Sequence, residues 1–119
     1  MYDDDFSREH SGKYIIEKVN LTRASLKEAA MFRNRIFSLL ALKQNYIIID
    51  MIQCEFMDST FLGSLVMINK KIKEQSGNLK LIVKNNKILE MFKKSGLIRF
   101  LEIYASIEEA LLLVSKKNI

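Results

Sequence analysis

The 119-residue sequence contains no proline and no tryptophan, and it has a single cysteine and a single histidine. Cys54 alone cannot form an internal disulfide, and with only His10 the chain lacks the Cys/His clusters that hold zinc. We therefore expect no metal site and no other bound cofactor. Because the nearby residues Ile52 and Phe56 are apolar, we expect Cys54 to be buried and unreactive.

Long hydrophobic runs are also missing. No uncharged run approaches the roughly 20 apolar residues that a membrane-spanning helix needs, so we expect no insertion into a membrane. The beginning of the chain carries Asp3, Asp4 and Asp5, where a secretory signal would be basic and then apolar. We therefore expect a cytoplasmic protein.

The excess of positive charge is modest, at +5. Lysines are spread from Lys13 to Lys117, and no basic helix or aromatic stacking platform accompanies them. We therefore expect no direct binding of nucleic acid. A solvated lysine-rich surface accounts for the charge, and one face of such a surface can attract an acidic protein.

Strand-like and helix-like stretches alternate along the chain. The predicted strands cover residues 14–19, 46–51, 79–84 and 100–104. The predicted helices cover residues 25–43, 60–75 and 86–94, with a final helix that begins at Ser106. This alternation predicts an α/β fold, a single domain with a mostly parallel central sheet and about four helices. We expect the domain to cover residues 13–119, with residues 1–12 as a flexible or edge-strand segment before it.

Short local signals set the ends of these elements. Ser25–Glu28 and Ser106–Glu109 have the pattern of a capping box, which starts a helix. The segment Ser76-Gly77-Asn78 ends the second helix, and we expect Gly77 to take the left-handed conformation there. The continuous apolar run over residues 46–51 indicates a strand that is buried on both faces of the sheet.

The most informative stretch is residues 54–63, CEFMDSTFLG, where an extended segment becomes a helix. On pattern alone, Asp58, Ser59 or Thr60 caps the start of that helix. A phosphate on a hydroxyl at this position would meet free backbone amides and the positive end of the helix dipole. It would also add about −1.5 to −2 charge units to the surface.

This motif resembles the signature of the STAS domain of bacterial anti-sigma factor antagonists. The matching segments are IIDM at 48–51, EFMDST at 55–60, Leu62-Gly63, and residues 77–81, 95–97 and 104–111, and they extend over about three quarters of the chain. In that family, a partner kinase phosphorylates a serine that follows an aspartate at a helix start. The resemblance implies phosphorylation of Ser59, with Thr60 as the weaker candidate. It implies partner binding by Asp58, Ser59, Thr60, Phe61 and Leu62.

Two positions depart from the family pattern. Phe61 stands where the family has a small residue, most often glycine, so it either occludes Ser59 or anchors a partner. The turn after the first strand offers Asn20, Thr22 and Arg23, where the family usually shows an acidic residue.

The first half of the second helix is apolar almost all round, which exceeds a one-sided core stripe. It is therefore deeply buried or docked to another protein, and a homodimer is one such arrangement. Gly63 matches the family glycine, and we expect it to admit a neighbouring backbone at close range.

The resemblance implies a partner-switching regulator. The unphosphorylated form would bind an anti-sigma factor serine kinase and so free a sigma factor for transcription. Phosphorylation of Ser59 would release the kinase, and a serine phosphatase would reset the protein. The alternative is a phosphorylation-independent STAS adaptor subunit of a signalling scaffold or a membrane-associated transport complex. Phe61 and the apolar helix start favour this alternative.

An enzyme is not expected. The segment after the first strand lacks the acidic pair with which a receiver domain holds magnesium. The chain also has no glycine-rich phosphate loop and no Ser/His/Asp set.

Overall fold

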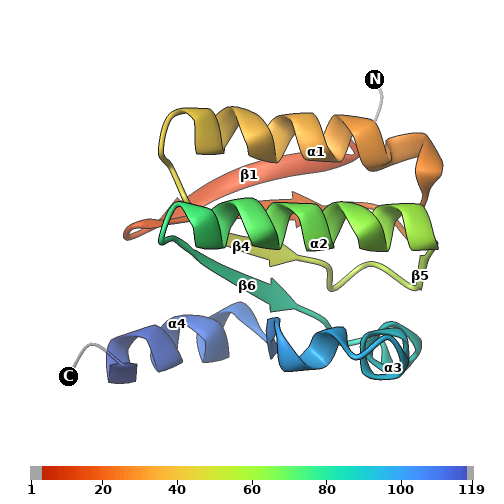
Figure 1. The fold of residues 1–119 in the computed structure, drawn as a ribbon. Coiled ribbons are helices and arrows are strands. Elements are labelled where there is room, and N and C mark those ends of the chain that lie inside the picture. The colour runs from red at the N-terminus through yellow and green to blue at the C-terminus, as the bar shows by residue number, and fades with distance from the viewer. Residues whose placement is uncertain (1–3, 118–119) are drawn as a thin grey trace.

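The computed structural model describes residues 4–117, and the side chains of residues 4–112. A central five-stranded sheet carries helices on both of its faces (Figure 1). Across the sheet the strands are β1 (Phe6–Ser11), β2 (Tyr14–Val19), β4 (Tyr46–Asp50), β6 (Asn78–Ile82) and β7 (Glu102–Tyr104). Strand β1 is antiparallel to β2, and the other neighbours are parallel. The predicted α/β fold with a mostly parallel sheet is confirmed.

Four α-helices connect or follow these strands, as the sequence predicted. They are α1 (Leu26–Ala41), α2 (Ser59–Glu74), α3 (Asn86–Lys94) and α4 (Ile107–Lys117), with a short 3₁₀ helix η1 (Leu97–Arg99) after α3. The capping box that starts α1 is formed, because the Ser25 side chain accepts from a helical amide and Glu28 accepts from the Ser25 amide at 3.1 Å. At α4, the Ser106 hydroxyl accepts from the Glu109 amide at 3.0 Å.

The core lies on both faces of the central strand β4. Ile47 and Ile49 point toward α1 and α2, whereas Ile48 lies in a smaller cluster on the opposite face, which includes Ala110 of α4. All three isoleucines are fully buried. The prediction that this run is buried on both faces is therefore confirmed.

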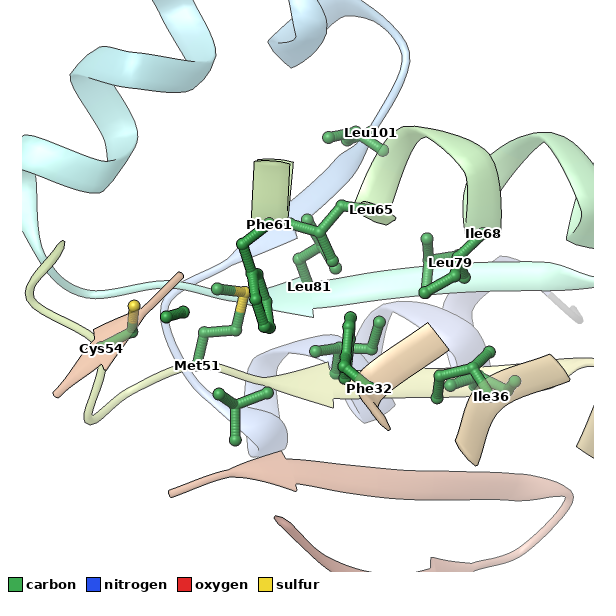
Figure 2. Packing of buried hydrophobic residues seen from close by; sticks show 14 of the residues in the cluster. Phe32, Ile36, Met51, Cys54, Phe61, Leu65, Ile68, Leu79, Leu81 and Leu101 are labelled. Carbon is green, nitrogen blue, oxygen red and sulfur yellow. The ribbon is translucent and has the colours of Figure 1, made fainter. Parts of the chain in front are cut away.

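Helix α2 divides its apolar residues between the core and the surface. Phe61, Leu65 and Ile68 are fully buried, and Figure 2 shows them pointing toward the sheet. Val66 and Met67, in contrast, are 40% and 48% exposed. The apolar first half of α2 therefore consists of a core stripe plus two surface residues.

The end of α2 differs from the prediction in its detail. The residue with the left-handed conformation is Ser76 (φ 58°), so the prediction for Gly77 is wrong. Gly77 is needed for space instead, because a Cβ there would lie 2.2 Å from the Asn45 carbonyl oxygen. The Asn78 amide donates to that same oxygen at 2.9 Å, which holds the chain close as it enters β6.

Three charged side chains of the sheet are buried, those of Glu17, Asp50 and Lys80, and the alternation of apolar residues did not predict them. Glu17 of β2 accepts hydrogen bonds from Arg8 and Arg35, and Lys80 of β6 donates to Glu102 at 2.7 Å. Burial raises the pKa of Glu102, but hydrogen bonds from Lys80 and its neighbours outweigh that effect and lower the pKa to about 2. Glu17 and Lys80 are therefore paired with opposite charges, and the Asp50 carboxylate accepts from the Ile52 amide at 3.0 Å, as their burial requires.

Candidate functional site

The site forms where β2 and β4 end on the same edge of the sheet. The segment after β2 contains β3 (Arg23–Ala24), which pairs in parallel with β5 (Phe56–Met57) in the loop before α2. The Thr22 carbonyl accepts from the Phe56 amide at 3.1 Å, and the Ala24 carbonyl accepts from the Asp58 amide at 3.0 Å. These bonds attach the loop to the turn after β2 and so position the start of α2.

Asp58 connects the starts of two helices. Its Oδ1 accepts from the Phe61 amide at 2.9 Å and caps α2, while its Oδ2 accepts from the Leu26 amide at 2.8 Å in the first turn of α1. These hydrogen bonds, that from Phe61 first, lower the pKa of the Asp58 carboxyl. The capping role was predicted from the sequence, but the contact with α1 was not, because it joins residues 32 positions apart.

We expect Asp58→Ala to lower the thermal unfolding midpoint, because one substitution removes acceptors from two helix starts. We expect Asp58→Asn to lower it less, since the amide oxygen still caps one helix. The folded carboxyl has a lowered pKa, so its stabilising contribution is present above the ordinary pKa of 3.8 and is lost as the pH falls through the folded value. Melting curves between neutral and acidic pH should therefore show the difference between wild type and Asp58→Ala shrinking. An unchanged difference at low pH would contradict the role of the charged carboxylate.

Ser59 and Thr60 are both exposed at the start of α2. Ser59 is the first helical residue, and the first turn contains no acidic side chain. Gly63 follows one turn later and is also exposed, and a Cβ there would meet no atom within 4 Å outside the helix. The close backbone approach expected at Gly63 is therefore absent. Instead, Gly63 leaves the helix surface beside Ser59 without a side chain, because residues four apart share one face.

Phe61 does not belong to this surface. Its side chain is fully buried and its ring stacks on Phe32 of α1, with centroids 4.7 Å apart. Figure 2 shows Phe61 pointing from α2 toward the sheet, beside Met51. The two predicted roles, occluding Ser59 and anchoring a partner, are therefore wrong, because the ring completes the core between α1 and α2. Leu62 is half-buried and packs against the same core.

Two apolar side chains of the preceding loop reach the surface near this site, and the sequence analysis missed them. Ile52 is 38% exposed and Phe56 is 40% exposed, with the Arg23 guanidinium 4.2 Å from the centre of the Phe56 ring. The sequence feature that could have identified them is their position two residues to either side of Cys54, in a short segment where apolar and polar residues alternate. Cys54 itself is fully buried, as predicted, and burial raises the pKa of its thiol.

The site offers a hydroxyl, a carboxylate and exposed apolar groups. Within residues 4–117, no three His, Cys, Asp or Glu side chains lie close enough together to hold a metal ion. In the same part of the chain, no helix has the length and apolar character needed to cross a membrane.

Solved structures with this fold include proteins from Thermotoga maritima, Planctomyces limnophilus and Bacillus. A candidate anti-sigma factor antagonist from Thermotoga maritima superposes with a TM-score of 0.84 at 26% identity, covering 92% of this chain and 94% of that one. A STAS domain protein from Planctomyces limnophilus gives 0.84 at 22% identity, covering 94% and 99%. The Bacillus cell fate determinant SpoIIAA in its phosphorylated form gives 0.73 at 20% identity, covering 92% and 98%.

No curated protein is significantly similar to the chain. The family model of the STAS domain, however, matches residues 25–110, from the capping residue of α1 to the first turn of α4. This range includes three strands of the central sheet, strand β5 and the complete loop before α2. By this match the chain belongs to the STAS domain family.

Proposed function

We propose that this protein is an anti-sigma factor antagonist that changes partners through phosphorylation of Ser59. The observation that carries the proposal is the position of Ser59, exposed at the first residue of α2 and next to the Asp58 cap. In its unphosphorylated form the protein binds an anti-sigma factor serine kinase, which releases a sigma factor for transcription. Phosphorylation then ends this complex, and a serine phosphatase restores it.

The local chemistry allows the fold to carry either state. A phosphate on Ser59 meets the free amides and the positive dipole end of α2, so the helix tolerates it. Arg23 lies on the adjacent strand β3 and supplies a positive charge near this helix start, since its charge also lowers the pKa of Asp58. The phosphate changes the surface rather than the fold, and a partner fitted to a neutral hydroxyl loses its contact.

In this proposal, the chemistry of phosphate transfer belongs to the partners. The kinase supplies the nucleotide and its magnesium ion, and the protein presents only the acceptor hydroxyl of Ser59, with Thr60 as the weaker acceptor. The protein has no catalytic function of its own, works in the cytoplasm and contacts no nucleic acid directly. Its output is the availability of a sigma factor.

The test uses Ser59→Ala and Ser59→Asp variants as paired baits in the native lysate, with mass spectrometry of the retained proteins. We expect a serine kinase on the alanine bait and its loss from the aspartate bait, because a negative charge replaces the hydroxyl in the interface. The recovered kinase, incubated with wild-type protein and ATP, should place a phosphate on Ser59.

A matched control is Ser38→Asp, which adds the same charge to an exposed serine near the other end of α1. This variant should retain the kinase. Equal retention by the Ser59→Ala and Ser59→Asp baits, with no kinase among the retained proteins, would reject the switch and leave Ser59 as part of a helix start.

The exposed residues Val66 and Met67 favour a second candidate function, a STAS adaptor whose binding is independent of phosphorylation. Such an adaptor would be a subunit of a signalling scaffold or a membrane-associated transport complex. It would keep its partner in both Ser59 variants and lose it when Val66 or Met67 is replaced by a charged residue.

A further inference from the structure

A groove lies between the second half of α2 and the segment around η1, away from Ser59. Its volume is about 610 Å³, and its apolar lining comes from Val66, Leu97, Phe100 and Leu101. Leu101 forms part of the floor, since it is only 8% exposed and lies near Leu65 in Figure 2. The space is enough for several large side chains of another molecule.

Large apolar side chains at this groove are exposed to solvent. Phe100 is 61% exposed and Ile98, beside it on η1, is 37% exposed, although neither is needed to close the core. Val66 lines the same groove from α2 at 40% exposure, whereas Ile98 is not one of its lining residues. A concentration of exposed large apolar groups around a hollow marks an interaction site more often than a solvated surface.

The lining of the groove carries more basic than acidic side chains. Lys70, Lys73 and Glu74 line it, and the Lys73 ammonium donates to the Phe100 carbonyl at 3.5 Å. The two segments that line the groove, residues 66–74 and 97–101, carry four exposed basic side chains and one exposed acidic one, a surplus of three. The groove therefore lies in a locally positive part of the surface.

We propose that this groove binds an acidic amphipathic helix of a partner protein. Leucine-like side chains on one face of such a helix would enter the groove between α2 and η1, as in other helix-in-groove complexes. Its flanking carboxylates would face Lys70 and Lys73. The basic rim attracts this partner and repels basic helices, which provides specificity.

Two other occupants fit the groove less well. A lipid bilayer presents a flat surface, and the hollow between α2 and η1 would leave its apolar floor uncovered. A second copy of this chain carries the same net positive charge, so docking against the basic face would be opposed by repulsion.

The binding is independent of the Ser59 switch. Val66, the groove residue closest to Ser59 along α2, lies seven positions further on, about 10 Å along the helix axis. The proposal therefore does not rest on partner switching. Ser59→Asp should leave the groove unchanged, so each proposal can fail without the other.

The test uses two synthetic amphipathic helical peptides of about 18 residues, or five turns, with identical leucine positions. One carries glutamates on its polar face and the other carries lysines. Fluorescence anisotropy with the full-length protein should show the acidic peptide binding at least about tenfold more tightly than the basic one. Phe100→Ala should weaken the acidic peptide by about tenfold, because it removes the exposed aromatic group of the groove. The double variant Lys70→Glu/Lys73→Glu should abolish the preference for the acidic peptide.

The matched control is Lys13→Glu/Lys27→Glu, which makes the same charge change on exposed residues outside the groove. This variant and Ser59→Asp should bind the acidic peptide like the wild type. If the Lys13→Glu/Lys27→Glu variant lost the preference for the acidic peptide equally, net charge alone would explain the effect, and the proposal would be overturned. Absence of acidic-peptide binding would also overturn it. So would binding only to vesicles containing phosphatidylserine, or a dimer in solution that Phe100→Ala dissociates.

Discussion

Replacing Phe61 with alanine should lower the free energy of unfolding by about 3–5 kcal/mol, the range for large aromatic deletions in a core. The ring is fully buried and stacks on Phe32, which itself stacks on Phe6 of β1. Removing it leaves a cavity between α1, α2 and the sheet. Asp58 accepts hydrogen bonds at the starts of both α1 and α2 and so holds the two helices in place. We therefore expect that neither helix moves far enough to fill the cavity.

Equilibrium urea denaturation measures this loss directly. Phe100→Ala is the matched control, since it deletes the same ring from a site that is 61% exposed, and it should change stability by less than about 1 kcal/mol. Phe61→Gly should be less stable than Phe61→Ala, because glycine adds about 1 kcal/mol of cost within a helix. A small effect of Phe61→Ala would show that the ring is not part of the core.

Removing both arginines that pair with Glu17 should cost about 3–5 kcal/mol, the penalty for leaving a buried charge without a partner. The Glu17 side chain is fully buried, whereas Arg8 and Arg35 are 30% and 32% exposed. Each arginine binds a different carboxylate oxygen. Arg8→Ala or Arg35→Ala alone should therefore cost less than half of the double variant, because the remaining guanidinium still neutralises the carboxylate.

The stability of a triple variant separates this explanation from lost packing. Glu17→Met in the Arg8→Ala/Arg35→Ala background removes the buried charge and should recover most of the lost stability, again measured in urea. Lys18→Ala serves as a control on the same hairpin, since its partner Glu9 is exposed, and it should cause almost no change. Additive single effects and no recovery in the triple variant would contradict the role of the buried charge.

Local sequence signals were sufficient to predict the order of the helices and strands. The capping box at Ser25 and the apolar periodicity after it specify α1, and the run over residues 46–51 specifies the central strand. Asp58 could likewise be identified as a cap, because a cap depends on residues within one turn. The exposed hydroxyl of Ser59 follows from the same local pattern.

Features that depend on distant parts of the chain could not be read in this way. Phe61 looked like a surface residue of the motif because nothing near it in the sequence reveals Phe32 on the facing helix. Gly77 looked like a conformational requirement, whereas the requirement is space beside Asn45, more than 30 residues earlier. In both cases the deciding contact is made by another element of the fold.

The sequence by itself therefore determined the α/β class, the helix starts and the position of the Ser59 hydroxyl at the start of α2. Only the tertiary structure decided which apolar residues of α2 are covered, that Glu17 is buried with two arginines, and that Asp58 joins two helix starts. It also brought Val66 and Phe100 to the same groove. The physical reason is that caps and periodicity act over a few residues, whereas burial and charge pairing depend on which elements pack together.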